Sequence, residues 1–400
     1  MEHAVRDSIP RREAVELICS KCRGPLEREW IPLERACGRV AAEDICSTLN
    51  LPAVPCSRWD GISFSYDRYL ACGGNVEGWQ EEQDYRRTNT GIGIFRDDFD
   101  TMVKIEDTCF QDGQLVSICQ KEPVERGQNV IPVGERMAQG EVLVPRDTLL
   151  SPSHLNRLAS GGNLVVPVYR KPVVALLPTG DELVACGETP LLGQTIESNT
   201  YSMRAKVEQW GGRALIWPIL KDNVQVLRQQ LRQAAAVADL VIIGGGSGRG
   251  ERDLLQFAIE GIGRLYFSTV IHGPGKRTCF AVVDGTPVVG LVGPPGGEEM
   301  TFDFYVVPAI RRLLRQEHRE SMVPVILDED VPPHHRVDFY FTMTLLRGED
   351  GKLHGRPLPH SDLDRNIALH TGYLHVPKQS TGFRKGEQVW VELRIGFENL

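Results

Sequence analysis

The sequence predicts a multidomain protein in which an α/β region lies between β-rich regions. Between Lys171 and Pro308, apolar runs of strand length alternate with helix-like segments, which is typical of an α/β domain. Residues 65–145 carry short alternating runs split by glycine and indicate a small β-rich module. Short strands separated by glycine turns return after Val323 and indicate an all-β domain at the C-terminus.

The composition is that of an ordinary soluble protein, with 41% hydrophobic and 24% charged residues among 400. The net charge of −8 argues against a nucleic-acid-binding scaffold. The first twenty residues are too rich in charge for a signal peptide, and no run of ~18 apolar residues indicates a membrane span. We therefore expect a cytoplasmic protein that engages neither membranes nor nucleic acid.

Ten cysteines are scattered along the chain, and in the absence of a secretory signal we expect reduced thiols. Cys19 and Cys22 form the only C-x-x-C. A structural zinc site needs four ligands, and no second C-x-x-C or histidine pair follows at finger spacing. The pair is either two cysteines on one face at the end of the first helix or a metal or redox site.

The N-terminal part begins with a predicted helix over Pro10–Cys19. A proline-rich segment then leads into a strand after Asp60-Gly61, a turn signal that would let Asp60 make a local Asx-turn. A short capped helix over 151–162 and a strand over Leu164–Tyr169 precede the α/β region.

In the α/β region, an apolar strand over Pro172–Pro178 is followed by Thr179-Gly-Asp-Glu-Leu183. Ligands of open α/β sheets bind at the carboxyl ends of strands, so Asp181 and Glu182 occupy the place where chemistry is expected. The alternative is an ordinary solvated loop.

The next predicted helix is capped by Asn199, and a strand over Arg213–Ile219 follows it. Asp222 closes this strand and Asn223 can cap the helix after it. A cap is the default role for either residue, and a ligand role at the strand end is the alternative for Asp222.

A glycine-rich turn follows the predicted buried strand Leu240–Ile243 and precedes Asp253 and a helix-like run. A strand, a glycine turn and a helix start make a natural anion site, because backbone N–H groups point outward there. The spacing matches neither dinucleotide-binding nor P-loop motifs, so a flexible turn is the alternative.

Further strands are predicted over Leu265–Ile271 and in a hairpin around Asp284-Gly285-Thr286, before an apolar helix that Pro308 can kink. Taken together, these segments resemble the molybdopterin molybdenumtransferase family, also called molybdenum insertases. The resemblance covers nearly the whole chain and rests on ordered motifs. These are Trp59-Asp-Gly61, Thr90-Gly91, Leu158-Ala-Ser-x-Gly162, Thr179-Gly-Asp-Glu-Leu183, Ser198-Asn199, Lys221-Asp222, Gly245-Gly246 through Asp253, and Pro274-Gly-Lys276.

The resemblance implies an α/β and β multidomain fold. Residues 1–45 and 140–170 would form a helical and extended linking domain, and residues 46–139 an inserted β-rich module. Residues 171–318 would form a molybdopterin-binding-like α/β domain, a mostly parallel sheet with helices on both faces, and residues 319–400 a C-terminal β-barrel. The resemblance also implies a homodimer with a cleft shared between subunits.

The activity implied by the resemblance is Mg²⁺-dependent insertion of molybdate into adenylylated molybdopterin, releasing AMP and molybdenum cofactor. Carboxylates at strand ends suit Mg²⁺, and a glycine loop suits the phosphates of the substrate. By motif position the catalytic residues would be Glu182, Asp60 and Lys276, and the metal ligands Glu182, Asp222 and Asp253. The substrate-binding residues would be Thr90, Thr179, Gly180, Ser198, Asn199, Gly245, Gly246, Ser247, Gly248, Gly250, Pro274, Gly275 and Arg277.

The sequence departs from the family pattern mainly where the family binds molybdate. The family's K-P-G-K-P is here Gly273-Pro-Gly-Lys-Arg277, so one lysine and one proline are missing, and His272 or Arg277 would have to supply the charge. The acidic residue of the inserted module's R-G-E-D is Arg136 here, and the barrel's arginine falls near Phe341. Alternatives are therefore a tungstate-specialised insertase, or a carrier that stores or hands over the cofactor. The adenylyltransferase that shares the α/β domain and downstream cofactor enzymes are the expected partners.

Overall fold

The computed structural model describes residues 8–24, 26–92, 98–245, 251–359 and 367–394. The chain divides into two compact units, one formed by residues 28–168 and the other by residues 1–27 together with 169–400. Among the described residues, no helix is both long and apolar enough to cross a membrane.

The smaller unit contains the β-rich module and the segments that lead into and out of it. Its three-stranded antiparallel sheet has the order β5-β4-β6, and the β7-β8 hairpin is separate from that sheet. Its elements are β1 (Arg28–Pro32), a 3₁₀ turn (Leu33–Arg35), β2 (Ile45–Cys46), β3 (Cys56–Ser57), β4 (Gly61–Phe64), α2 (Tyr66–Ala71), β5 (Tyr85–Thr88), β6 (Thr101–Lys104), a second 3₁₀ turn (Ile105–Asp107), β7 (Thr108–Gln111), β8 (Gln114–Ile118), β9 (Val130–Ile131), β10 (Val142–Val144), α3 (Pro152–Ser160) and β11 (Val165–Tyr169).

Two separate apolar clusters hold this smaller unit together. Phe64, Trp79 and Tyr85 belong to the cluster under β4, β5 and β6. Leu143, Leu158 and other residues of β2, β10, α3 and β11 form the second cluster. Ser151 caps α3 as predicted, since its hydroxyl accepts a hydrogen bond from the His154 N–H. Gly38 ends no α-helix, because residues 33–35 form only a single 3₁₀ turn.

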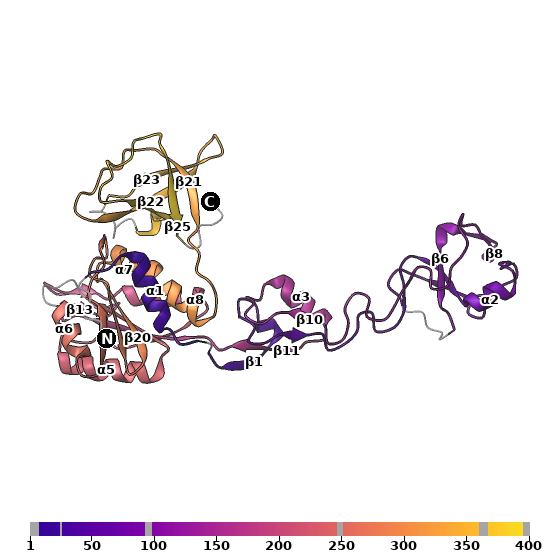
Figure 1. Ribbon diagram of the computed structural model, residues 1–400, viewed down its shortest axis with the longest axis horizontal. Coiled ribbons are helices and arrows are strands. Elements are labelled where there is room, and N and C mark those ends of the chain that lie inside the picture. Colours follow the sequence, from indigo (N-terminus) through magenta and orange to yellow (C-terminus); the bar gives the residue numbers. More distant parts are fainter. Residues whose placement is uncertain (1–7, 25, 93–97, 246–250, 360–366, 395–400) are drawn as a thin grey trace. The chain divides into compact units, whose positions relative to one another are not determined.

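The larger unit is built around a six-stranded sheet with the order β15-β12-β16-β20-β19-β17. The first four strands are parallel, and β19 and β17 run antiparallel to their neighbours. Helices cover both faces, with α5 and α6 packed together on one face and α4 packed against α7 on the other (Figure 1). The predicted α/β domain is therefore confirmed as a mostly parallel sheet with helices on both faces.

The elements of this α/β part follow each other as strand and helix. They are α1 (Arg11–Lys21), β12 (Val173–Thr179), β13 (Leu183–Val184), β14 (Thr195–Ile196), α4 (Asn199–Gln209), β15 (Arg213–Ile216), α5 (Val224–Val237), β16 (Leu240–Gly245), α6 (Glu251–Ile259), β17 (Gly263–Phe267), β18 (His272–Gly273), β19 (Cys279–Val283), β20 (Thr286–Leu291), α7 (Pro295–Thr301), a π-helical turn (Phe302–Val306) and α8 (Val307–Leu313). The apolar helix thus contains a π-helical turn just before Pro308, at the place where the sequence predicted a kink.

The C-terminal strands form a closed five-stranded barrel, drawn in yellow in Figure 1. β22 closes it by pairing with both β23 and β24, while β21 pairs with β23 and β25. The strands are β21 (Met322–Leu327), β22 (Asp338–Arg347), β23 (Leu353–Pro357), β24 (Gly372–Val376) and β25 (Gln388–Leu393), with a 3₁₀ turn at Ile367–Leu369. Each of these five strands pairs with two others of the barrel, and the inward residues form one apolar cluster.

Candidate functional site

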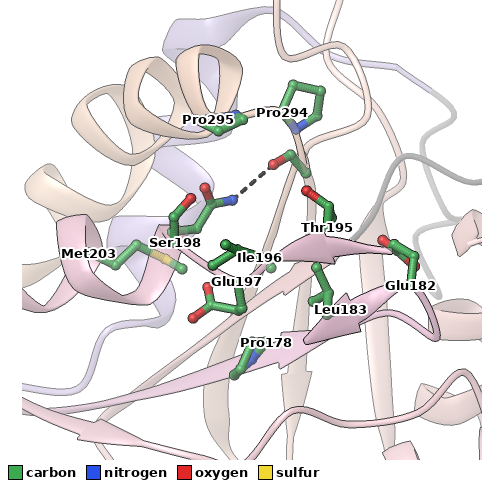
Figure 2. A pocket seen from close by; sticks show the side chains of 13 residues that line it. Pro178, Glu182, Leu183, Thr195, Ile196, Glu197, Ser198, Met203, Pro294 and Pro295 are labelled. Carbon is green, nitrogen blue, oxygen red and sulfur yellow. Dashed lines mark hydrogen bonds between the residues drawn. The ribbon is translucent and has the colours of Figure 1, made fainter. Parts of the chain in front are cut away.

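A cavity of about 320 Å³ opens at the carboxyl edge of the six-stranded sheet (Figure 2). β12 and β16 are adjacent, yet the chain leaves β12 for β15 on one side and leaves β16 for β17 on the other. This reversal is the topological switch point at which open α/β sheets bind ligands. The lining residues are Pro178, Glu182, Leu183, Thr195, Ile196, Glu197, Ser198, Asn199, Met203, Gly244, Gly293, Pro294 and Pro295.

The turn after β12 places Glu182 at the cavity. Thr179 pairs with Gly245 of β16, and the Gly180 N–H donates to the Leu220 carbonyl at 3.0 Å. Gly180 has a φ of 151°, and a Cβ on it would lie 2.7 Å from both carboxylate oxygens of Glu182. Glycine is therefore required for the Glu182 carboxylate to fold back over this turn. The predicted residues Thr179, Gly180 and Glu182 lie together.

Asp222 belongs to a group of carboxylates at the same sheet edge. Its N–H donates to Asp181 Oδ1 at 3.3 Å, and Lys221 Nζ donates to the Asp181 carbonyl at 3.2 Å. Partial burial, followed by the charges of Asp181 and Glu182, raises the pKa of Asp222. The structure thus brings two of the three predicted metal ligands, Glu182 and Asp222, into electrostatic contact.

These oxygen donors have the chemistry that Mg²⁺ prefers, and their mutual repulsion would be relieved by a cation. The third predicted ligand, Asp253, has its backbone in α6, but its side chain lies outside the described part of the chain. Within the described residues, no group of three His, Cys, Asp or Glu side chains is close enough to hold a metal ion. The three-carboxylate magnesium site stays a prediction.

The start of α4 forms the wall opposite Glu182, but Asn199 does not cap the helix as predicted. Asn199 is the first helical residue, and its Nδ2 donates to the Gly293 carbonyl at 2.8 Å, the dashed line in Figure 2. Glu197 takes the capping role by accepting the Thr200 N–H at 2.9 Å. Ser198 lines the cavity between them. The Asn199 bond ties α4 to the loop after β20.

The structure describes the predicted glycine loop only up to Gly245. Gly244 lines the cavity and Gly245 ends β16. Gly246, Ser247, Gly248 and Gly250 lie outside the described residues, so their role stays a prediction.

The segment Pro274–Arg277 is not among the residues that line this cavity. Gly275 has a φ of 88°, and a Cβ there would lie 2.3 Å from Thr301, so its backbone passes close to α7. The Lys276 carbonyl accepts the Val270 N–H at 2.9 Å. The roles of Pro274, Gly275, Lys276 and Arg277 stay predictions.

The prediction that His272 could supply positive charge is wrong. It is buried, and its Nδ1 contacts the Pro274 carbonyl at 3.0 Å while its Nε2 contacts the Tyr305 hydroxyl at 2.5 Å. Burial, reinforced by the charge of Arg11, lowers the pKa of His272 to about 3. The imidazole is therefore neutral at physiological pH.

Asp60 and Thr90 lie together in the smaller unit. The exposed Asp60 carboxylate accepts the Thr90 N–H at 2.6 Å and the Thr90 hydroxyl at 2.8 Å. These two bonds, the backbone bond first, hold the pKa of Asp60 below its usual value. The contact joins two predicted site residues that are thirty positions apart, so Asp60 does more than make a local Asx-turn.

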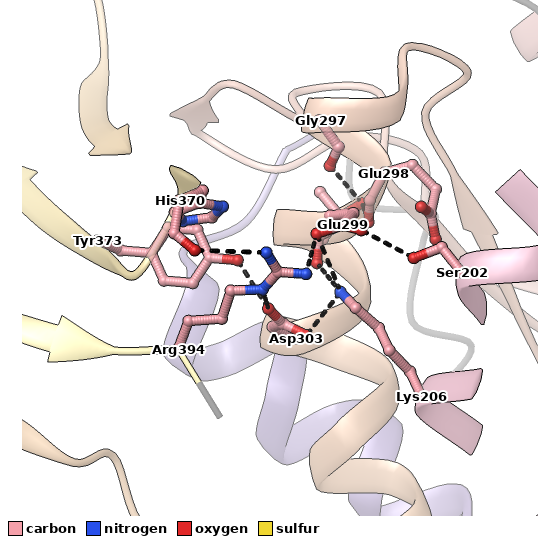
Figure 3. Close-up of polar contacts among 10 residues, drawn as sticks. Ser202, Lys206, Gly297, Glu298, Glu299, Asp303, His370, Tyr373 and Arg394 are labelled. Carbon is pink, nitrogen blue, oxygen red and sulfur yellow. Dashed lines mark hydrogen bonds and ion pairs between the residues drawn. The ribbon is translucent and has the colours of Figure 1, made fainter. Parts of the chain in front are cut away.

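Sequence reasoning missed a buried ionic network directly behind the cavity (Figure 3). Lys206 of α4 contacts Asp303 Oδ1 at 2.8 Å and the Glu299 carbonyl at 3.0 Å. Arg394 after β25 pairs with Glu299, and the Tyr373 hydroxyl donates to Asp303 Oδ2 at 2.7 Å. The signal that could have found it is Glu298-Glu299 and Asp303 within an otherwise apolar helical segment.

Glu298 is the unusual member of this region. It is fully buried, and neither of its carboxylate oxygens accepts a hydrogen bond from the described residues. Burial raises the pKa of Glu298 to about 8. Because Glu298 is mostly protonated at pH 7, the charges of Glu299 and Asp303 balance those of Lys206 and Arg394.

Comparisons with known protein families match two long segments of the chain. A family model described as the MoeA N-terminal region (domain I and II) matches residues 9–162. A second model, described as a probable molybdopterin binding domain, matches residues 175–312.

Two curated relatives carry the name molybdopterin molybdenumtransferase. The relative from Haemophilus influenzae is 30% identical over 304 residues, spanning 73% of this chain and 74% of its own. The relative from Bacillus subtilis is 28% identical over 412 residues, spanning 97% of this chain and 94% of its own. A solved structure of a molybdopterin biosynthesis MoeA protein from Pyrococcus horikosii matches with a TM-score of 0.81 at 25% identity, covering 97% of this chain and 99% of that one. The sequence and fold matches agree, and the chain belongs to the molybdopterin molybdenumtransferase family.

Proposed function

We propose that this chain transfers molybdenum to molybdopterin. In detail, we propose that it inserts molybdate into adenylylated molybdopterin in a Mg²⁺-dependent reaction that releases AMP and molybdenum cofactor. The names of the relatives support the general transfer, and the match to the molybdopterin binding domain family supports the substrate class.

The observation that carries the proposal is the cavity at the switch point of the sheet. It is closed by the start of α4 and by the loop Gly293–Pro295, and its polar side chains are Glu182, Thr195, Glu197, Ser198 and Asn199. The hydroxyl and amide groups can bind a pterin or a ribose by hydrogen bonds. Glu182 and Asp222 lie at the rim where a phosphate group with its cation would approach.

Mg²⁺ fits this rim because the donors are carboxylate oxygens that repel each other without a cation. Glu182 and Asp222 would hold it, with Asp253 as the third predicted ligand. When bound there, the ion would neutralise charge on the phosphate groups as AMP departs. Glu197 is not proposed as a magnesium ligand, since both of its carboxylate oxygens accept hydrogen bonds from Thr200.

The remaining roles in the proposal rest on motif position. Lys276 and Arg277 would supply positive charge to the oxyanion, because arginine offers a planar donor fork suited to oxyanions. Asp60, which accepts two hydrogen bonds from Thr90, is the remaining predicted catalytic residue. A homodimer and transfer of the nucleotide from an adenylyltransferase complete the proposal.

The test is an assay of purified protein with adenylylated molybdopterin, molybdate and Mg²⁺. The expected result is release of AMP together with metal-bearing cofactor, and loss of both on addition of a chelator. Replacing molybdate by tungstate at equal concentration tests the tungstate-specialised alternative. Nucleotide binding without AMP release would contradict the proposal.

A second candidate is a carrier that binds the molybdopterin nucleotide without inserting metal. One observation favours it: among the described residues that line the cavity there is no lysine or arginine. An oxyanion such as molybdate would find no cationic donor among these described residues. Tight binding of molybdopterin that is insensitive to molybdate would favour the carrier.

A further inference from the structure

Two exposed thiols, those of Cys109 and Cys119, are in contact at the β7-β8 hairpin. Neither cysteine is among the predicted site residues. Cys109 Sγ and Cys119 Sγ lie 2.9 Å apart, within about 1 Å of the ~2.05 Å length of a disulfide bond. Both side chains are exposed to solvent. The pair is therefore close enough for bond formation and open to a reagent.

The hairpin geometry explains why the two sulfurs meet. Cys109 on β7 lies opposite Ser117 on β8, and side chains two residues apart on a strand point to the same side. Cys119 lies two residues beyond Ser117, and its N–H donates to the Asp107 carbonyl at 2.7 Å. That bond continues the ladder past the end of β8 and holds Cys119 diagonally across from Cys109.

We propose that Cys109 and Cys119 form a reversible intramolecular disulfide, with a low-molecular-weight disulfide such as oxidised glutathione as the oxidant. The Cys119 thiolate attacks one sulfur of the oxidant, so a mixed disulfide forms on Cys119 and one reduced thiol leaves. The Cys109 thiolate, having given its proton to solvent, then attacks Cys119 Sγ and expels the second thiol. The protein loses two electrons and two protons, and one oxidant molecule becomes two thiols.

The local polar contacts assign the order of attack. Hydrogen bonding with Cys109 first, and with Ser117 Oγ at 3.3 Å, holds the pKa of Cys119 below its usual value. The same contact with Cys119 raises the pKa of Cys109. Cys119 is therefore the thiolate that meets the oxidant, and Cys109 is the resolving thiol. Ser117 is a positioning residue for this step.

The cysteines of the C-x-x-C motif behave in the opposite way. Cys22 is buried, and burial raises the pKa of its thiol and raises that of Cys19 to about 11. Neither forms a thiolate readily at neutral pH. We therefore interpret the pair at the end of α1 as unreactive thiols.

The test uses the full chain, reduced and then equilibrated with mixtures of reduced and oxidised glutathione. Free thiols are trapped by alkylation and the protein is digested with trypsin. Both cysteines fall in the single peptide Ile105–Lys121. We expect this peptide to lose two hydrogen atoms and to resist alkylation, and to regain two alkylation sites after reduction.

Variants separate the disulfide from general thiol reactivity. Cys109→Ser should trap glutathione on Cys119, because no resolving thiol remains, whereas Cys119→Ser should slow the reaction of Cys109 at neutral pH. Ser117→Ala should move the pH profile of Cys119 alkylation upward while leaving the disulfide attainable. The control is Cys37→Ser, which removes another exposed thiol and should leave the peptide disulfide unchanged.

The proposal is overturned if Cys109 and Cys119 each carry glutathione, or if both stay free at a ratio that modifies Cys37. Because the hairpin lies outside the proposed catalytic residues, neither result bears on AMP release. The two proposals can therefore fail separately.

Discussion

Two groups of acidic residues in the larger unit are neutralised differently. At the cavity rim, Glu182 and Asp222 lie near another carboxylate, Asp181, and Lys221 Nζ donates to the Asp181 backbone carbonyl. Behind the cavity, Glu299 and Asp303 are buried and paired with Lys206 and Arg394. The buried carboxylates pair with two cations, whereas among the described residues neither Glu182 nor Asp222 forms an ion pair.

This difference separates structure from function. A buried carboxylate must be paired because its desolvation is otherwise too costly, so the network is explained by folding alone. The rim carboxylates are partly solvated and gain nothing from facing each other, so their arrangement favours a ligand cation. α4 connects the buried network to the cavity loop, because Asn199 bonds to Gly293 while Ser202 donates to Glu299 at 2.8 Å.

The largest expected effect is on stability, from Asp303→Asn. The change leaves Lys206 and Arg394 with excess buried positive charge, which should lower the free energy of unfolding by about 3–5 kcal/mol. The urea midpoint measures the loss. The matched control is Asp181→Asn at the rim, which removes one of several like charges and should leave the midpoint nearly unchanged. Equal losses for the two variants would erase the distinction between the groups.

The next effect concerns pH and Glu298. Its pKa of about 8 in the folded protein lies above the ordinary value of 4.5, so the folded form holds a proton that the unfolded form has lost. The stability from this group is complete below pH ~4.5 and is lost as the pH rises toward 8, by roughly 2–5 kcal/mol in all. Glu298→Gln cannot titrate, so its free energy of unfolding should lack this slope, and the difference between wild type and variant should change with pH. Urea unfolding between pH 5 and 8.5 measures it, with the exposed Glu16→Gln as control. A parallel pH dependence in Glu298→Gln would show that Glu298 is ionised in the folded chain.

Much of the fold could be predicted from the sequence because local patterns agree with the global arrangement. The apolar runs at β12, β16 and β20 read as buried strands, and the hairpin around Asp284-Gly285-Thr286 joins β19 to β20 as expected. The π-helical turn at Phe302–Val306 could not be predicted, because it depends on how α7 and α8 pack.

The site was less predictable because its contacts join distant residues. Spacing places Glu182 and Asp222 at strand ends, but it cannot show that Asn199 reaches across to Gly293, ninety-four positions away. The Asp60–Thr90 contact likewise spans two motifs that were found separately. Glu298 and Glu299 are charged residues of a type that is usually exposed. Their burial in the structure is what shows that they share a network with Lys206 and Arg394.

A further prediction concerns Asp222→Asn at the rim. Removing one of the mutually repelling carboxylates should leave the melting temperature unchanged or slightly raised, while Mg²⁺-dependent AMP release falls by about 100-fold, or ~2.7 kcal/mol. Glu182→Gln should give the same loss of activity. The assay is AMP release as a function of Mg²⁺ concentration, and full activity of both variants would show that Glu182 and Asp222 are not magnesium ligands.

The smallest effect separates the two neighbours Asp222 and Asn223, for which the sequence allowed the same capping role. Asn223 Oδ1 accepts the N–H groups of Gln225 at 2.9 Å and Val226 at 3.1 Å, so it is the cap of α5. Asn223→Ala should therefore lower the free energy of unfolding by about 1 kcal/mol, and Asn223→Asp should restore it because aspartate caps equally well. Both variants keep Asp222 and should release AMP at the wild-type rate. The urea midpoint and the AMP assay together should give opposite patterns for the two positions: loss of activity without loss of stability at 222, and loss of stability without loss of activity at 223. Loss of AMP release in Asn223→Asp, with its cap intact, would show that the boundary between the structural and the functional residues at this edge lies one position further along the chain.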